Sequence, residues 1–171
     1  IAAHVRRGGR VLGVCGGLQM LGRTISDPDG VEGPPGQAQG LGLLDLDTVL
    51  TGDKVLRPAS GRLAAGGAFE GYEIHVGRTE GPALQRPLLI RDDGTGEGAI
   101  SPDGRVSGAY VHGLFGLASA RAAFLADLGA ASDGVDEATR VDAALDEIAE
   151  RLEQQFDIPL LASIAGLEPR P

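Results

Sequence analysis

The chain has 171 residues, of which 42% are hydrophobic, and this is about the size of one globular domain with its own core. Its 24 acidic residues outnumber 15 basic ones, and the formal charge of −9 at pH 7 excludes the cationic surface that nucleic acids require. A single cysteine excludes an internal disulfide, and no apolar run reaches the roughly 18 residues that cross a bilayer, so we expect a cytoplasmic protein without a membrane partner.

The first segments of the chain predict a helix, a strand and a second helix. Residues 1–7 resemble a helix end, and two glycines follow where a left-handed cap favours glycine. Residues 10–14 (RVLGV) are apolar without alternation, which is typical of a strand covered on both faces. A short helix is predicted over residues 16–23, and this order of elements indicates an α/β fold.

The middle of the chain is expected to be rich in strands and its end in helices. Short β-like runs separated by glycine turns lie at residues 41–50, 69–76, 87–91 and 105–111. The Gly/Pro clusters at residues 33–40 and 57–67 are expected to be loops within one domain over residues 1–171. Two helices close the chain, and in the last of them acidic residues separate apolar ones that recur at helical spacing: Val141, Leu145, Ile148, Leu152 and Phe156.

The only cysteine, Cys15, stands in GVCGGLQ (13–19), where the predicted strand turns into the predicted helix. We expect a nucleophile elbow, because a side chain beside so sharp a turn would collide with the returning backbone, and Gly13, Gly16 and Gly17 avoid that collision. The helix N-terminus favours a thiolate, and the Gly16 N–H can stabilise an oxyanion on a carbonyl that Cys15 attacks. The alternative is a small buried cysteine without chemistry.

A cysteine nucleophile needs a base, and the chain offers His4, His75 and His112. His112 is the best candidate, because it ends an apolar run in GAYVHGLF (108–115) and α/β proteins hold catalytic groups at strand ends. His4 is expected at the surface. One cysteine and three scattered histidines lack the spacing of metal ligands, so we expect no metal site.

The third histidine lies in GYEIHVGRT (71–79), which alternates like a strand. This alternation places Glu73 and His75 together on one face. Such a face either lines a pocket or faces solvent, and the pattern alone does not choose between the two.

Several segments resemble known glutaminases. GVCGGLQMLG (13–22) resembles the nucleophile motif Gly-x-Cys-x-Gly-x-Gln of class I glutamine amidotransferases. DPDGVEG (27–33), GYEIHVGRT and GAYVHGLF then follow in order over essentially the whole chain, and this combination resembles the C-terminal glutaminase domain of the cobyric acid synthase family.

The resemblance implies a flavodoxin-like α/β sheet flanked by helices and a defined set of site residues. Cys15 would attack the amide carbon of L-glutamine, form a thioester and release ammonia, with His112 as base and then acid. Gln19 matches the motif glutamine that helps hold the substrate, and Gly16 and Gly17 lie beside it.

One position departs from the broad superfamily. The usual His-x-Glu would place an acid at position 114, where this chain has Leu114. The resemblance therefore implies a Cys–His dyad without an orienting carboxylate. Whether Glu73 takes that place in space, and whether His75 has a catalytic role, stays open.

In the family, the ammonia serves an N-terminal synthetase domain, which uses ATP and Mg²⁺ to amidate side-chain carboxylates of a corrinoid in cobalamin biosynthesis. No Gly-x-x-x-x-Gly-Lys-Ser/Thr string occurs in this chain, so we expect that domain to be absent from it and the glutaminase domain to need no cofactor. Because the chain opens at Ile1 without a leader, we also expect an N-terminally truncated domain that is poorly soluble and weakly active alone.

Other functions compete with this one. The same chemistry occurs in other dyad-type amidotransferases, such as cobyrinic acid a,c-diamide synthase or the amidase partner that modifies cell-wall lipid precursors. A cysteine peptidase or esterase on a similar scaffold, and a non-catalytic binding domain that keeps the fold, are rivals from different classes.

Overall fold

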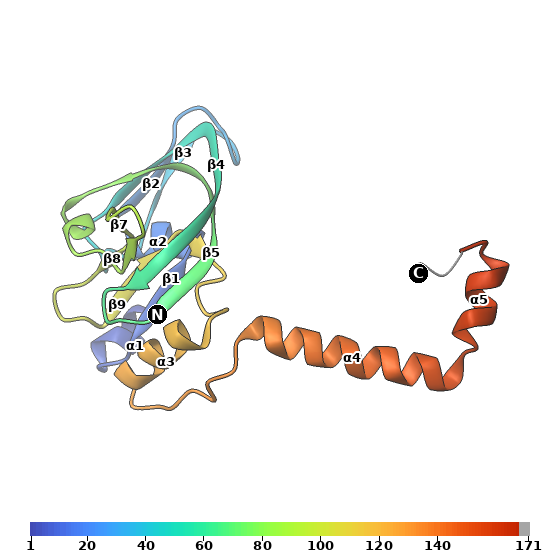
Figure 1. Ribbon diagram of the computed structural model, residues 1–171. Coiled ribbons are helices and arrows are strands. Elements are labelled where there is room, and N and C mark those ends of the chain that lie inside the picture. Colours follow the sequence, from blue (N-terminus) through green and yellow to red (C-terminus); the bar gives the residue numbers. More distant parts are fainter. Residues whose placement is uncertain (168–171) are drawn as a thin grey trace. The chain divides into compact units, whose positions relative to one another are not determined.

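The computed structural model describes residues 1–167, which form two compact units (Figure 1). The first unit spans Ile1–Gly134, and the second begins at Val135. Every strand among the described residues belongs to the first unit, as do the candidate site residues. The α/β fold class predicted from the sequence is confirmed.

The first unit consists of short helices and of strands that are mostly short. Its helices are α1 (Ala2–Arg6), α2 (Gly16–Leu21), the 3-10 helix η1 (Pro82–Gln85) and α3 (Ala118–Asp127). Its strands are β1 (Val11–Val14), β2 (Thr24–Asp27), β3 (Gly36–Gln39), β4 (Asp47–Leu63), β5 (Ala68–Glu80), β6 (Leu89–Arg91), β7 (Gly96–Glu97), β8 (Ala99–Ile100), β9 (Val106–Ala109) and β10 (Val111–His112).

The strands form two sheets. In the smaller sheet β1 and β9 are parallel, with Val14 opposite Ala109, and β8 pairs antiparallel with β9. In the larger sheet the order is β10-β5-β4-β2-β3, and Figure 1 shows its long β4–β5 hairpin. One residue, Tyr110, separates β9 from β10, so the chain passes there from the small sheet to the large one. The carboxyl ends of β1 and β9 therefore meet at the edge of β5.

Two hydrophobic clusters hold these sheets to the helices. The first joins the β4–β5 hairpin to β10 and α3 and contains Leu63, Phe69, Leu89, Val111, Leu114 and Ala120. The second joins α2 to β9 and the segments around it and contains Leu18, Leu21, Leu44, Leu46, Val106 and Tyr110. Because Leu18 and Leu21 are completely or almost completely buried, α2 is fixed directly behind the cysteine.

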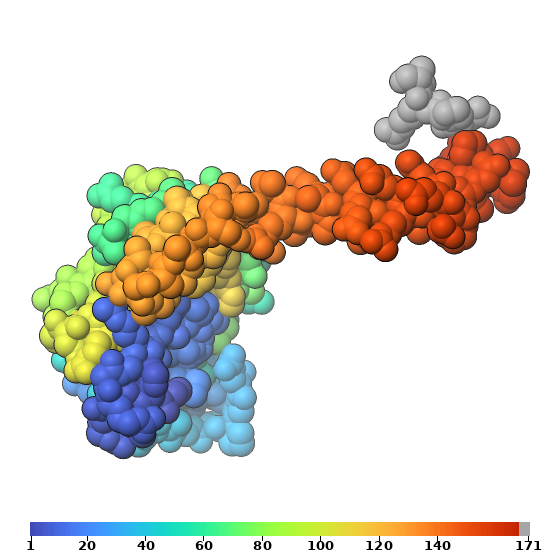
Figure 2. All heavy atoms as spheres, turned by 90° about the horizontal axis from the view of Figure 1, so that it is seen from below, coloured from blue at the N-terminus to red at the C-terminus, as the bar shows by residue number. Residues whose placement is uncertain are grey.

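The N-terminal segment differs from its prediction in one respect. Its helix and strand are present, and Figure 2 shows the segment in dark blue on the surface of the first unit. The strand, however, is not covered on both faces, because its side chains are partly exposed; among the described residues β1 also pairs with β9 alone and lies at a sheet edge. Val14 is 38% exposed, and Val11 and Leu12 are half-buried.

The two Gly/Pro clusters were wrongly predicted to be loops only. β3 occupies part of the first, and β4 continues through Pro58 and Gly61 of the second, opposite β5. Gly61 has φ +152, and a Cβ there would lie 2.2 Å from the Ile90 carbonyl oxygen. The missing side chain of Gly61 thus permits the close approach of β6. At this position glycine continues the sheet and does not interrupt it.

The second unit contains α4 (Glu137–Gln155) and α5 (Ile158–Ile164). The predicted spacing of apolar residues in α4 is confirmed, and these side chains are about half exposed. The sequence reasoning missed α5, although Asp157 caps it by accepting from the Leu160 N–H at 3.0 Å and Pro159 lies in its first turn. Among the described residues, no helix has both the length and the apolar character that a membrane span requires.

Candidate active site

Cys15 lies at the predicted turn between β1 and α2. Its φ is +55°, and it is the only non-glycine residue with a positive φ in the described part of the chain. Its N–H donates to the Ala109 carbonyl at 2.8 Å, and its carbonyl accepts from the Leu18 N–H at 2.9 Å. A strained conformation of this kind costs roughly 1–3 kcal/mol and persists only where surrounding contacts hold it. The predicted elbow geometry is therefore present.

The three glycines of the elbow have different surroundings. A Cβ on Gly13 would lie 2.6 Å from the Gly17 carbonyl and from Leu21, so the predicted collision with the returning backbone is confirmed there. At Gly16 and Gly17 an added Cβ would meet nothing within 4 Å. The prediction of a collision at these two positions was wrong, because the space that a Cβ would occupy is free at both glycines.

The elbow contacts the edge of β5 through two side chains. The Cys15 thiol donates to the Ile74 carbonyl at 3.2 Å, and Gln19 Nε2 donates to the Val76 carbonyl at 3.2 Å. Carbonyls two residues apart on a strand point the same way, and β10 pairs with β5 only at Tyr72 and Glu73. The edge of β5 beyond Glu73 is therefore free to accept the elbow.

His112 reaches the same strand from β10. It lies opposite Tyr72, and the two rings stack with centroids 5.2 Å apart and an angle of 9°. Tyr72 and Ile74 lie two positions apart, or about 7 Å along a strand, so His112 and Cys15 contact β5 at neighbouring positions. No hydrogen bond joins them among the described residues, and His112 Nε2 is buried without a partner there.

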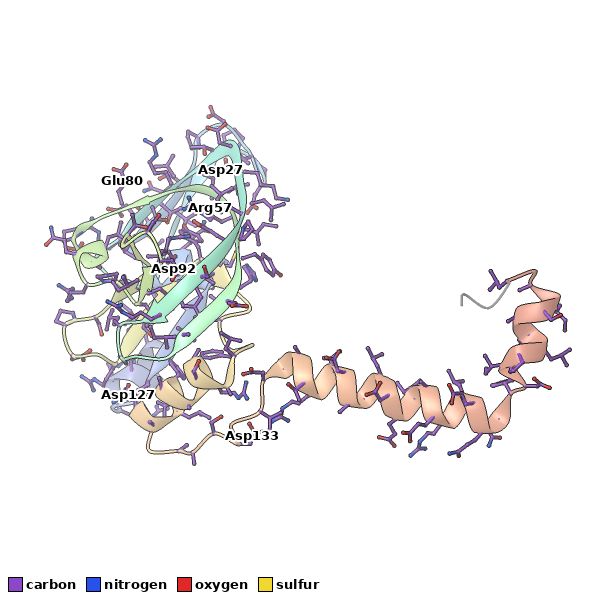
Figure 3. The ribbon with its side chains drawn as sticks, in the orientation of Figure 1. Asp27, Arg57, Glu80, Asp92, Asp127 and Asp133 are labelled. Atoms are coloured by element: carbon purple, nitrogen blue, oxygen red, sulfur yellow. The ribbon has the colours of Figure 1, made fainter. Side chains whose placement is uncertain are left out.

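The face shared by Glu73 and His75 points inward. His75 Nε2 lies 2.9 Å from Glu73 Oε1, and Arg57 and Arg91 donate to Glu73 Oε2 at 2.8 and 2.7 Å. Burial alone would raise the pKa of Glu73, but the hydrogen bonds from Arg57, His75 and Arg91 outweigh it and lower the pKa. Figure 3 shows Arg57, which comes from β4.

The sequence left open whether this face lines a pocket or faces solvent. The second alternative is wrong, because Glu73 is only 5% exposed. The Glu73 carboxylate is occupied by His75 and the two arginines. His112, from the neighbouring strand β10, stacks on Tyr72 and so lies on the face of the sheet opposite to Glu73. Glu73 therefore does not occupy the place of a triad acid. Leu114, at the position of that acid in the superfamily, is buried in the first hydrophobic cluster.

Two residues of this region escaped the sequence reasoning. The Tyr110 ring stacks on His75 with centroids 3.7 Å apart, and its hydroxyl bonds to Gln19 and Thr79. Glu97 accepts from the Tyr110 N–H at 2.7 Å, and burial raises its pKa to about 7. Tyr110 stands in GAYVHGLF and could have been noticed there. The position of Glu97 depends on strand register, which no local pattern reveals.

Two other features of the sequence analysis, His4 and the DPDGVEG segment, have no contact with Cys15 among the interactions of the described residues. His4 is exposed, as predicted, and no group of three or more His, Cys, Asp or Glu side chains suited to a metal occurs among residues 1–167. In DPDGVEG, the Asp27 carboxylate accepts from the N–H groups of Val31 and Glu32, which lowers its pKa (Figure 3). This motif forms a turn.

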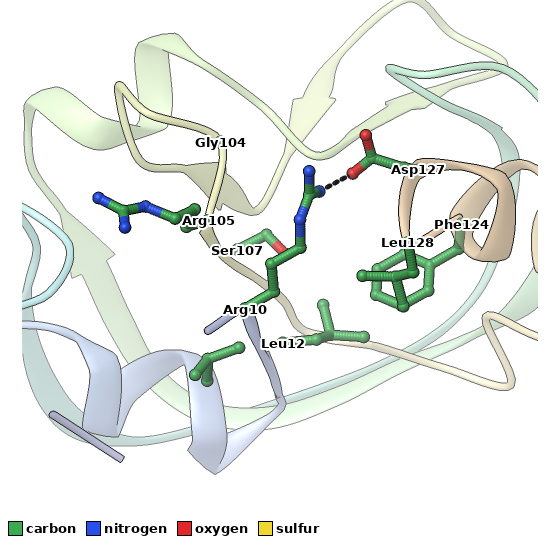
Figure 4. Close-up of a pocket in the computed structure, with 9 residues that line it drawn as sticks. Arg10, Leu12, Gly104, Arg105, Ser107, Phe124, Asp127 and Leu128 are labelled. Atoms are coloured by element: carbon green, nitrogen blue, oxygen red, sulfur yellow. Dashed lines mark hydrogen bonds and ion pairs between the residues drawn. The ribbon is translucent and has the colours of Figure 1, made fainter. Parts of the chain in front are cut away.

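A pocket lies at the opposite end of β1 from Cys15 (Figure 4). Leu12, Phe124 and Leu128 line it, and Arg10 forms an ion pair with Asp127 at its rim. Because Arg10 directly precedes β1 whereas Cys15 follows it, this pocket is separate from the elbow.

Comparisons with known proteins agree with the elbow geometry. The CobB/CobQ-like glutamine amidotransferase domain family matches residues 1–120. Proteins called cobyric acid synthase are similar over nearly the whole chain: one from Caulobacter sp. (strain K31) is 64% identical over 168 residues, which is 98% of this chain and 35% of that protein. Those from Methylocella silvestris and Bradyrhizobium sp. are 58% and 54% identical, over 97% and 96% of this chain and 35% and 34% of their own lengths. The chain thus spans about a third of the length of these relatives.

Proposed function

Because the chain belongs to the CobB/CobQ-like glutamine amidotransferase domain family, we propose that it hydrolyses L-glutamine at Cys15 and supplies the released ammonia to a synthetase reaction. The observation that carries this proposal is the strained elbow, which holds the single cysteine against β5, the strand with which His112 of β10 is also paired. Gly16 and Gly17, which directly follow Cys15 in the chain, have free space where a Cβ would lie, and this leaves room for a substrate.

The proposed reaction begins with a proton transfer. In the structure the Cys15 thiol donates to the Ile74 carbonyl, so this bond has to break before the thiol proton passes to His112. The thiolate then attacks the amide carbon of glutamine, and the Gly16 N–H stabilises the oxyanion. His112 returns the proton to the leaving nitrogen, and ammonia departs. Water, deprotonated by His112, hydrolyses the Cys15 thioester to glutamate and restores the thiol.

The acceptor of the ammonia is a further part of the proposal. The similar proteins are called cobyric acid synthase, so we assign the ammonia to amidation of corrinoid carboxylates. This amidation would use ATP and Mg²⁺. We assign that step to a separate synthetase domain, because these 171 residues contain no phosphate-binding loop sequence. The identity to these proteins favours this acceptor over those of other dyad-type amidotransferases.

Release of ammonia from L-glutamine by the wild type and three variants tests the proposal. Cys15→Ala should abolish the rate, and His112→Ala should lower it by about 10²–10⁴-fold, as removal of a general base does. His75→Ala should cause a smaller loss, because the His75 side chain is 91% buried and bonded to Glu73. Equal losses for His75→Ala and His112→Ala, in variants with wild-type circular dichroism, would contradict the assignment of the base.

The division of labour has its own test in a protein that also carries the synthetase domain. Cys15→Ser should abolish amidation with glutamine but retain amidation with excess ammonium, since ammonia bypasses the thioester. Loss of both activities would overturn this part of the proposal. Cleavage of peptides or esters without ammonia release would instead support a cysteine hydrolase.

A further inference from the structure

The hydroxyl of Tyr110 begins a row of hydrogen bonds that runs away from Gln19. Gln19 Nε2 lies 3.2 Å from the Tyr110 hydroxyl, which lies 2.5 Å from Thr79 Oγ1. Thr79 Oγ1 in turn lies 2.6 Å from Thr48 Oγ1. These four residues come from α2, the β9–β10 junction, β5 and β4, so four separate elements meet in one row of polar atoms.

The chemistry of these groups gives the row a direction. A carboxamide nitrogen only donates, so the Tyr110 oxygen accepts from Gln19 and its own proton is available to Thr79. Burial raises the pKa of Tyr110, which keeps the hydroxyl protonated for this purpose. Thr79 then has its own proton available for Thr48, which is only 1% exposed. The row is thereby anchored in the core.

The same arrangement determines how the Gln19 carboxamide is oriented. Its two N–H groups are directed to the Val76 carbonyl and the Tyr110 hydroxyl. If the amide were flipped, Gln19 Oε1 would face the lone pairs of the Val76 carbonyl, which is unfavourable. With Nε2 held by protein groups, Oε1 is left as the acceptor on this side chain, and no bond to it is found within residues 1–167.

We propose that Tyr110, supported by Thr79 and Thr48, is a positioning residue that holds the Gln19 carboxamide with Oε1 presented to the ammonium group of L-glutamine. This inference rests on the proposed glutaminase function and adds to it a determinant of substrate affinity. Tyr110 acts through Gln19, and the Cys15 thiol is outside the row. Loss of the Tyr110 hydroxyl should therefore weaken substrate binding and leave the reactivity of the thiol unchanged.

The test uses the single cysteine of the full chain as its own reporter. Iodoacetamide alkylates Cys15, and the concentration of L-glutamine that halves the initial alkylation rate reports how readily substrate occupies the site, whether bound or as the thioester. Tyr110→Phe should raise this concentration roughly three- to tenfold, the value of one neutral hydrogen bond, with the rate at zero glutamine unchanged. Thr79→Val should act in the same direction. Ser119→Ala, which removes an exposed hydroxyl on α3 bonded to the Ala68 carbonyl, is the matched control and should change neither quantity.

A double-variant cycle separates positioning from a general effect on the fold. In a Gln19→Met background, Tyr110→Phe should cause no further loss of protection, because the group it positions has gone. Equal, additive losses in both backgrounds would overturn the inference, as would an unchanged half-protecting concentration in Tyr110→Phe. Failure of L-glutamine to protect even the wild type would instead contradict the proposed function.

Discussion

Substitution of Glu73 by glutamine should remove a large part of the stability of the first unit. The Glu73 carboxylate is 5% exposed, and it bonds to Arg91, whose side chain is 11% exposed, and to His75. Removal of one partner from such a buried pair typically costs about 3–5 kcal/mol, because the other charge stays buried without compensation. Arg57 is 59% exposed and adds little. Since the glutamine side chain still offers a hydrogen-bond acceptor, we expect the free energy of unfolding to fall by about 3 kcal/mol, at the lower end of this range.

Urea unfolding followed by circular dichroism measures this loss, and a melting temperature lowered by roughly 6–12 °C should accompany it. Glu70→Gln on the same strand is the control, because Glu70 is exposed and its substitution should change stability by less than about 0.5 kcal/mol. Adding Arg91→Met to Glu73→Gln should recover part of the loss by removing the stranded cation. Equal stability of Glu73→Gln and Glu70→Gln would refute the reasoning.

Three further perturbations have defined outcomes. Burial raises the pKa of Glu97 to about 7, so its contribution to stability is complete below pH ~4 and is lost as pH rises through 7. Between pH 5.5 and 8.5 this loss is about 2 kcal/mol, and Glu97→Gln should abolish it in urea titrations at these two pH values; parallel profiles of wild type and variant would contradict the prediction. Gly13→Ala should cost about 1–3 kcal/mol by forcing its Cβ against the next turn, and Gly52→Ala, where the added Cβ meets nothing within 4 Å, should not. Leu114→Ala should cost about 2–5 kcal/mol as a core cavity but leave Cys15 alkylation unchanged; a large fall in alkylation by the folded variant would count against a dyad.

The elbow was predictable because its signals are local. A cysteine flanked by glycines, between an apolar run and a helical segment, marks the turn in the sequence, and of the three glycines Gly13 is the one at which an added Cβ would collide. The same holds for the alternation that places Glu73 beside His75, which is confirmed by their hydrogen bond. Whether that face was buried depended on the arginines of β4 and β6, which local alternation does not reveal.

The contacts of the elbow could not be predicted, because they depend on long-range register. Docking of Cys15 and Gln19 on β5 requires β10 to pair with β5 only as far as Glu73, and this follows from the crossover at Tyr110. Likewise, β4 extends through Pro58 because its partner β5 is long, so tertiary pairing overrides the local preference for a loop. Patterns along the chain predicted the candidate site residues, and the pairing of distant strands determined their neighbours.

The most direct test of the central claim is covalent capture of the nucleophile. The chain should be incubated with 6-diazo-5-oxo-L-norleucine, an electrophilic analogue of glutamine, and the modified peptide identified by mass spectrometry. The account predicts one adduct, on Cys15, formed more slowly in His112→Ala and suppressed by excess L-glutamine but not by D-glutamine. An adduct on another residue, or a Cys15 adduct whose rate neither L-glutamine nor His112→Ala changes, would contradict the claim that Cys15 is the nucleophile of a glutaminase.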